Sequence, residues 1–127
     1  MVLRNAESIS TMVTEDNDAA LTDKLKTGRS AVLFMADWCG PCAMLMDALA
    51  TTDHFKDYFK KNEIAVYYVD VDKLPVIARA RNILSIPDMH FYRDGLRTGR
   101  IIGAVHSQVL LGQMNAAYNI SERVHPS

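Results

Sequence analysis

Cysteine is sparse in this chain, whose 127 residues include two, at positions 39 and 42. Two cysteines are too few for the disulfide framework of a small secreted protein, and a domain of this length can bury enough apolar surface without one. No apolar run is long enough to span a bilayer, and the N-terminal segment lacks the continuous apolar stretch of a secretory signal. We therefore expect a cytoplasmic protein.

An excess of charge of either sign is also missing. Lys and Arg together number 14, against 15 for Asp and Glu, which gives a formal net charge of −1. This balance gives no electrostatic reason to expect nucleic acid or an anionic membrane as a partner. A hydrophobic fraction of 49% with a charged fraction of 23% is typical of a soluble globular domain.

Residues that could bind a metal are few and scattered. A zinc site needs four ligands, usually a second C-x-x-C pair or two neighbouring histidines. The histidines, His54, His90, His106 and His125, show no such spacing. We therefore expect no metal and no other cofactor. The cysteine pair is then a structural disulfide, two inert thiols or a redox couple. A disulfide that closes so small a ring constrains the unfolded chain little, so it would add little stability.

The hydrophobic pattern predicts one domain over residues 1–127, with its core at about 8–120. We expect strands at 8–13, 31–36, 64–71, 88–92 and 100–102, and helices at 14–26, 41–60, 75–81 and from 107 onward. Expected local signals are N-caps at Thr14 and Ser107, an interruption at 51–53 and a hairpin turn at 93–95. This order predicts an α/β fold, with a mixed central β-sheet and helices on both faces.

Both cysteines lie in the stretch WCGPC, residues 38–42, between a buried strand and a helix. Positions three apart share one face of a helix, so the two sulfurs can meet. Cys39 at the helix entrance would face unpaired N–H groups and the positive end of the helix dipole, which favour the reactive thiolate. Cys42 would lie one turn inside, placed to resolve a mixed disulfide. Gly40 removes bulk and Pro41 costs no helix hydrogen bond, so a redox couple is favoured.

These residues resemble the thioredoxin family. WCGPC matches the family's active-site motif in full, and Ser85-Ile86-Pro87 looks like its cis-proline element, followed at family spacing by 93–95 and 102–104. The resemblance covers roughly residues 8–120 and implies a thioredoxin fold. It also implies a thiol–disulfide oxidoreductase that reduces protein disulfides by a dithiol mechanism, in which Cys39 attacks and Cys42 resolves.

The resemblance further implies what surrounds the two sulfurs. The residues that would support the cysteines are Trp38, Gly40, Pro41 and Pro87, the last of them cis and lying against both sulfurs. A shallow apolar rim that binds protein disulfide substrates would consist of Trp38, Ile86, Gly103 and Ala104. A thioredoxin-reductase-type enzyme or a small thiol would supply the electrons.

Two core positions depart from the family pattern. Thioredoxins carry a buried aspartate in the strand before the motif and a lysine near it, and the matching residues here are Leu33 and Tyr68. Losing both charges together is coherent, because a lone buried charge is costly. His90 and Asp88, just after the expected cis-proline, are candidates for a proton relay, although an ordinary strand side chain is the simpler explanation of each.

The helix after the motif departs as well. Ala43 stands where family members usually have a basic residue, and Asp47 replaces the proline that kinks their helix. Four methionines lie near these residues in the expected fold, most of them core and one or two available to an adaptable binding surface. They are Met35, Met44, Met46 and Met89.

Other uses of the fold stay open. The altered core slightly favours a binding or adaptor module with little redox turnover, whereas the intact WCGPC argues against one. Oxidases and isomerases of this fold usually carry a histidine between the cysteines, whereas Gly40-Pro41 resembles reducing members. We therefore expect a protein-disulfide reductase.

Overall fold

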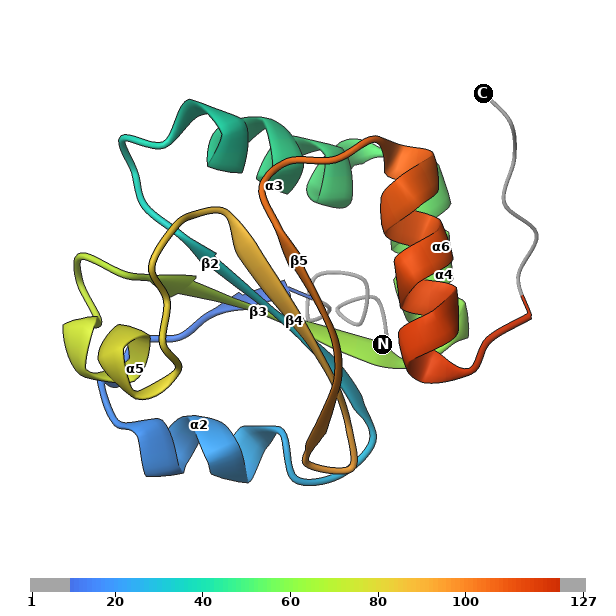
Figure 1. Cartoon of the computed structure of the whole chain (residues 1–127). Coiled ribbons are helices and arrows are strands. Elements are labelled where there is room, and N and C mark those ends of the chain that lie inside the picture. Colours follow the sequence, from blue (N-terminus) through green and yellow to red (C-terminus); the bar gives the residue numbers. More distant parts are fainter. Residues whose placement is uncertain (1–9, 122–127) are drawn as a thin grey trace, which may run out of the picture.

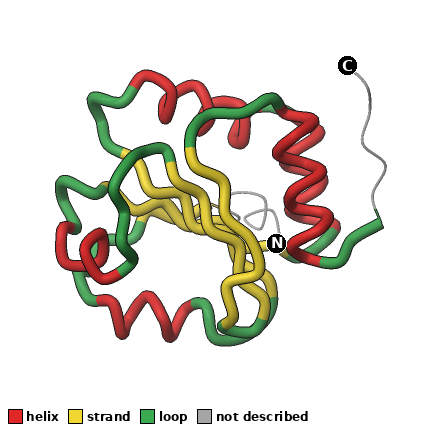
Figure 2. The backbone as a smooth tube through the Cα atoms, in the orientation of Figure 1, coloured by secondary structure: helices red, strands yellow, loops and turns green. Residues whose placement is uncertain are grey.

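The computed structural model describes residues 10–121, so Ser8, Ile9 and His125 lie outside the described residues. Its strands are β1 (Ser10–Met12), β2 (Arg29–Met35), β3 (Ile64–Asp70), β4 (Asp88–Arg93) and β5 (Leu96–Ile102). Its helices are α2 (Asp18–Lys24), α3 (Gly40–Thr51), α4 (Asp53–Lys61), α5 (Pro75–Ala80) and α6 (Ser107–Tyr118). The strands form one sheet in the order β1-β3-β2-β4-β5 (Figure 1 and Figure 2).

Strand β2 lies at the centre of this sheet. It runs parallel to β3 and antiparallel to β4, with Leu33 beside Tyr68 in one neighbour and beside Met89 in the other. All of its residues after Arg29 are buried. A strand covered on both faces must be apolar throughout, which explains the run AVLFMA. The chain becomes exposed again just after this strand, where the cysteine motif begins.

Helices cover both faces of the sheet, as Figure 1 shows. One core, which includes Phe55 of α4 and Tyr118 of α6, lies on the face covered by α3, α4 and α6. The other, which includes Leu21 of α2 and Ile77 of α5, lies on the opposite face. Parallel pairing in the first half and an antiparallel hairpin at the end make the sheet mixed. The predicted α/β fold is confirmed.

The long helix expected after the motif is two helices. α3 continues through Asp47 to Thr51, so the position of the family's kinking proline lies within continuous helix. Thr52 then has extended backbone, with φ −81° and ψ 120°, and is both the C-cap of α3 and the N-cap of α4. The interruption predicted at residues 51–53 is confirmed. Beyond it, α4 buries Phe55 and Phe59.

Two predicted helix caps are wrong. The N-cap of α2 is Asn17 and not Thr14, and its side chain accepts a hydrogen bond from the N–H of Ala20 at 3.1 Å. Ser107 is the first residue of α6, and the N-cap position belongs to His106, which makes no side-chain capping bond. Several capping residues follow one another in the stretch TEDND, so the sequence locates that helix start only to within a turn.

The β4–β5 hairpin follows its predicted turn, although β5 begins earlier than expected. Asp94 and Gly95 both have positive φ, 49° and 88°, as a tight hairpin turn requires. Further along β5, a Cβ on Gly99 would lie 3.0 Å from Ala117 Cβ and 3.0 Å from Phe91 Cδ2. The missing side chain therefore allows β5 and α6 to approach closely.

Asp16 joins two segments on the α2–α5 face. Its carboxylate accepts hydrogen bonds from the N–H groups of Val76 at 3.0 Å and Ile77 at 2.9 Å, in the first turn of α5. Such N–H groups have no partner within their own helix, and a negative charge is favourable at the positive end of the helix dipole. Asp16, which lies just before α2 in the sequence, thus caps α5.

We predict that Asp16→Ala lowers the free energy of unfolding by about 1–2 kcal/mol, the usual effect of losing a helix cap. Urea denaturation at neutral pH measures the change. Asp23→Ala is the control, because Asp23 pairs with Lys26 on the open surface and should matter by less than about 0.5 kcal/mol. Equal losses in the two variants would contradict the capping role.

Candidate active site

Cys39 and Cys42 form a disulfide at the start of α3. Their Cα atoms are 5.2 Å apart, an ordinary spacing for a disulfide. Cys39 is the N-cap of α3, and Gly40, Pro41 and Cys42 open its first turn. The sequence therefore predicted the placement of the pair, with one cysteine at the helix entrance and one just inside.

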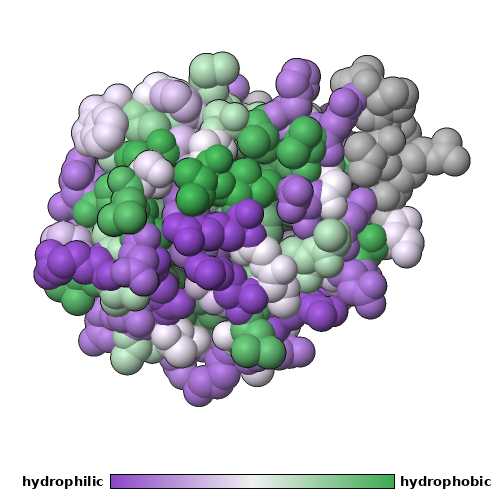
Figure 3. Space-filling view, in the orientation of Figure 1, coloured by the Kyte–Doolittle hydropathy of each residue, from purple (hydrophilic) through white to green (hydrophobic). Residues whose placement is uncertain are grey.

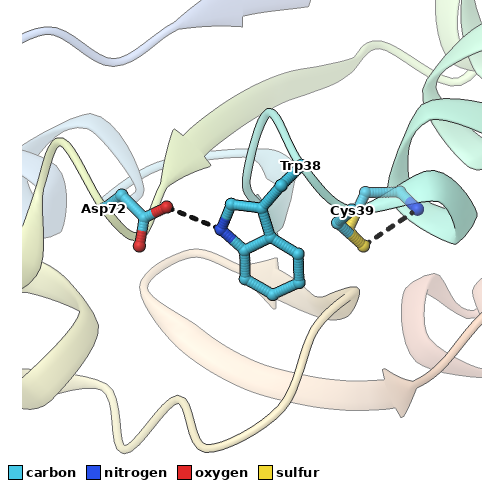
Figure 4. The surroundings of a disulfide bond; sticks show 4 residues. Trp38, Cys39 and Asp72 are labelled. Atoms are coloured by element: carbon cyan, nitrogen blue, oxygen red, sulfur yellow. Dashed lines mark hydrogen bonds between the residues drawn. A yellow bond between two sulfur atoms is a disulfide. The ribbon is translucent and has the colours of Figure 1, made fainter.

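The two sulfurs have different surroundings. Cys42 is completely buried, whereas Cys39 keeps 4% of its surface exposed. The Cys39 sulfur accepts a hydrogen bond from the N–H of Cys42 at 3.2 Å, drawn in Figure 4. That N–H is one of the unpaired donors at a helix start, so the same geometry would stabilise a thiolate at Cys39 after reduction.

Trp38 is held by a hydrogen bond that the sequence analysis missed. Its indole Nε1 donates to Asp72 Oδ2 at 2.7 Å, although the residue is 71% exposed. Figure 4 shows the ring between Asp72 and Cys39. Asp72 follows β3, which runs parallel to β2, so the loops after the two strands leave the same edge of the sheet. Parallel strands predicted at 31–36 and 64–71 were the signal that could have identified this neighbour.

Further charged residues lie on the same side of the disulfide. Lys73 Nζ is 3.4 Å from Asp37 Oδ2 and 3.9 Å from Asp70 Oδ2. The Oδ1 atom of Asp70 accepts hydrogen bonds from the N–H groups of Asp72 at 2.9 Å and Lys73 at 3.2 Å. These bonds order the loop that holds the indole.

The loop before β4 and the segment after β5 lie together. The Ile86–Pro87 peptide bond is cis. Pro87 is buried and Ile86 half-buried, and the Pro87 carbonyl accepts a hydrogen bond from the Gly103 N–H at 2.7 Å. Ala104, the next residue, is exposed. Three of the expected rim residues, Ile86, Gly103 and Ala104, are therefore brought together by the structure.

The two departures from the family pattern are neighbours in the core. Leu33 is completely buried and Tyr68 is 7% exposed, and both belong to the core that includes the disulfide. Burial raises the pKa of Tyr68. Among residues 10–121 the Tyr68 hydroxyl has no hydrogen-bond partner. Neither side chain is charged at neutral pH, so this part of the core is apolar.

The two candidates for a proton relay lie on the opposite face of the sheet from the disulfide. In β4, Asp88 and His90 alternate with Met89, which packs in the core that includes the disulfide. The His90 ring lies 4.8 Å from that of Phe34, which belongs to the other core. A proton passing directly from either residue to Cys42 would have to cross the sheet. This arrangement argues against the relay that the sequence suggested.

Asp88 instead forms a buried ion pair. It is completely buried, and Arg100 donates to it from Nε at 3.1 Å and from an Nη atom at 2.7 Å. His90 Nε2 lies 3.1 Å from the same carboxylate, within ion-pair distance but outside hydrogen-bond geometry. Burial raises the pKa of Asp88, but His90 and Arg100 together outweigh it and hold the pKa below its ordinary value.

We predict that Asp88→Asn lowers the free energy of unfolding near neutral pH, because Arg100 loses its ionised partner. A depressed pKa in the folded state means that the stabilising contribution is full above the unfolded value, roughly 3.9, and is lost as the pH falls below it. The difference between parent and variant should therefore shrink below about pH 4. Urea denaturation at several pH values measures this difference. A difference in the free energy of unfolding that does not change with pH would contradict the ion pair.

Between residues 10 and 121, no three His, Cys, Asp or Glu side chains gather closely enough to hold a metal ion. No helix in that range is both long enough and apolar enough to cross a membrane.

Comparison with known proteins gives consistent matches. The thioredoxin family model matches residues 9–116. A thioredoxin of Mycolicibacterium smegmatis is 34% identical over 112 residues, covering 87% of this chain and 96% of its own length. An H-type thioredoxin of Chlamydomonas reinhardtii is 34% identical over 94 residues, covering 70% of this chain and 80% of its own.

Solved structures agree with these matches. Oxidised mitochondrial thioredoxin 3 of Saccharomyces cerevisiae has a TM-score of 0.67 at 25% identity, covering 87% of this chain and 98% of its own. The reduced thioredoxin pre-protein of Schistosoma mansoni has a TM-score of 0.65 at 29% identity, covering 84% and 97%. The fold, the cysteine pair at a helix start and these matches lead to one conclusion: the chain belongs to the thioredoxin family and is a thiol–disulfide oxidoreductase of the disulfide-reductase kind.

Proposed function

We propose that the chain reduces disulfides in other proteins and that Cys39 is the attacking residue. In the dithiol form, the Cys39 thiolate bonds to one sulfur of the substrate disulfide, and the other substrate sulfur leaves as a thiolate that takes a proton from water. The Cys42 thiolate then attacks the Cys39 sulfur, forms the Cys39–Cys42 disulfide and releases the second substrate sulfur. The substrate gains two electrons and the protein loses them.

The unequal setting of the two sulfurs supports this order. The Cys39 sulfur is slightly exposed and accepts the N–H bond at the helix start, which favours its thiolate. Cys42 is completely buried. An incoming disulfide can therefore reach Cys39 first, and Cys42 meets the substrate only once the mixed disulfide has formed.

The surrounding residues support a protein substrate. Trp38, Ile86, Gly103 and Ala104 would form the apolar rim, with the backbone of Ile86 pairing with an extended substrate segment beside cis Pro87. A reductase of the thioredoxin-reductase type or a small thiol would regenerate the dithiol. One solved structure with a TM-score of 0.65 concerns the thiol-resolving mechanism of a yeast mitochondrial 1-Cys peroxiredoxin via glutathione/thioredoxin systems, which supports a thiol-based partner.

We also propose that the protein works in a reducing compartment such as the cytoplasm, because its cysteines must return to the dithiol between turnovers. Relatives named as chloroplastic or mitochondrial occur among the matches, and those names describe those proteins. The adaptor alternative gains no support from the comparisons, whose reported relatives bear the name thioredoxin.

We predict that the parent protein accelerates dithiothreitol-driven reduction of insulin and that Cys39→Ser abolishes the acceleration. The turbidity of the precipitating insulin chains measures the rate. In the absence of dithiothreitol, pre-reduced Cys42→Ser should retain the first attack and accumulate a mixed disulfide at Cys39, because no resolving thiol is present. Mass spectrometry of the trapped adduct identifies the cysteine. An adduct that instead accumulates on Cys42 in the Cys39→Ser variant would reverse the assigned order.

We predict that Leu33→Asp speeds resolution of the mixed disulfide near neutral pH, because a carboxylate in the core that includes the disulfide can accept the proton of Cys42. Leu33→Asn is the matched control, since it has the same shape without a titrating group. Single-turnover rates across pH, measured at a temperature where all three proteins are folded, separate chemistry from the expected loss of stability. Equal rates for the two variants would show that the apolar core does not limit resolution.

A further inference from the structure

A hydrophobic cavity lies along α3, the helix that begins at the disulfide, and opens toward the β5–α6 loop. It has a volume of about 400 Å³ and is bounded by α3, the start of α4, the β5–α6 loop and the start of α6. Its walls include the apolar side chains of Met44, Ala48, Phe55 and Val105. No Asp, Glu, Lys or Arg lines it, and its hydrophilic residues are His106 and Ser107.

The cavity is continuous with the proposed substrate rim through Ala104. That residue lines the cavity and directly follows Gly103, whose N–H is bonded to the carbonyl of cis Pro87. On the other wall, Met44 lies two residues after Cys42 and is 74% exposed. A substrate segment that reaches Cys39 along the rim therefore has the cavity mouth beside it.

The two sides of the disulfide differ in polarity. The Trp38 side has the ion pair of Asp37 with Lys73 and the carboxylate of Asp72, which accepts the indole hydrogen bond. The Ala104 side has the uncharged cavity, and Figure 3 shows hydrophobic side chains gathered above a hydrophilic band on the face that carries the β5–α6 loop. A charged substrate side chain entering the cavity would lose water and find no ionic partner there, whereas an apolar one would gain from burial.

We propose that this cavity is a specificity pocket that accepts one large apolar side chain, of the size of Leu, Met or Phe, close to the attacked cysteine of a protein substrate. The inference rests on the proposed reductase function and assigns its substrate class: disulfides flanked by an apolar residue on one side. A volume of about 400 Å³ leaves room for such a side chain, and exposed Met44 can adjust to its shape.

Disulfide-linked peptide dimers test the proposal. Each peptide has one cysteine in a Ser-rich sequence, and a single Leu is moved through the three positions on either side, with an all-Ser dimer as reference. Pre-reduced protein is mixed with each dimer, and quenched samples are quantified by mass spectrometry over a range of peptide concentrations. We expect one Leu position to raise kcat/KM about tenfold over the reference, through a lower KM, as burial of most of a leucine side chain would give.

Three variants locate the preference. Ala48→Phe fills the cavity from its half-buried wall and should abolish the Leu preference while the all-Ser dimer is still reduced. Ala50→Phe is the matched control, because Ala50 is exposed on the same helix outside this cavity and should keep the preference. Met44→Glu changes an exposed side chain and tests the cavity mouth if Ala48→Phe does not fold.

The outcomes separate the two proposals. Reduction of all dimers at the same rate would leave the reductase function intact and overturn the specificity pocket. A Leu preference that survives in Ala48→Phe, or in Met44→Glu where Ala48→Phe does not fold, would overturn it as well. Reduction of no dimer by the parent protein would contradict the proposed function itself.

Discussion

The site depends on the burial of one strand. Strand β2 is hydrogen-bonded on both edges and covered on both faces, so its register and direction are determined by its neighbours. The chain can change direction only where this strand ends, and α3 begins there with Cys39 as its N-cap. The position of the reactive sulfur is therefore set by packing in the middle of the sheet rather than by contacts among the motif residues.

This constraint explains which parts of the molecule the sequence could predict. Continuous apolar residues identified β2, and the spacing of Cys39 and Cys42 placed the pair at a helix start. The sequence of β4 also predicts that Met89 lies on one face of the sheet and that Asp88 and His90 lie on the other, because neighbouring residues of a strand point to opposite faces. The proton relay through Asp88 and His90 was suggested because both residues closely follow Pro87 in the sequence. It did not take the alternation of side chains along the strand into account.

Contacts between distant segments were harder to foresee. The bond from Trp38 to Asp72 and the cap that Asp16 supplies to α5 join loops 34 and about 60 positions apart. From sequence alone, Asp72 and Asp16 could equally have formed hydrogen bonds within their own turn or helix. The packing of the sheet is what brings each of them to its distant partner. Sequence reasoning thus located the chemistry through local patterns, whereas the surroundings that select a substrate depend on which loops the topology brings together.

The close approach of β5 to α6 at Gly99 has an effect well away from that glycine. The β5–α6 loop connects these two elements, and the separation of its ends is set partly where Gly99 faces Ala117 and Phe91. A side chain at Gly99 would require Ala117 or Phe91 to shift by a few tenths of an ångström, and a shift of α6 would be passed along the helix to the loop that holds Ala104 and Val105. The width of the cavity lined by Ala104 and Val105 therefore depends partly on the packing of Gly99 against side chains of β4 and α6, so a substitution at a position outside the cavity would alter it.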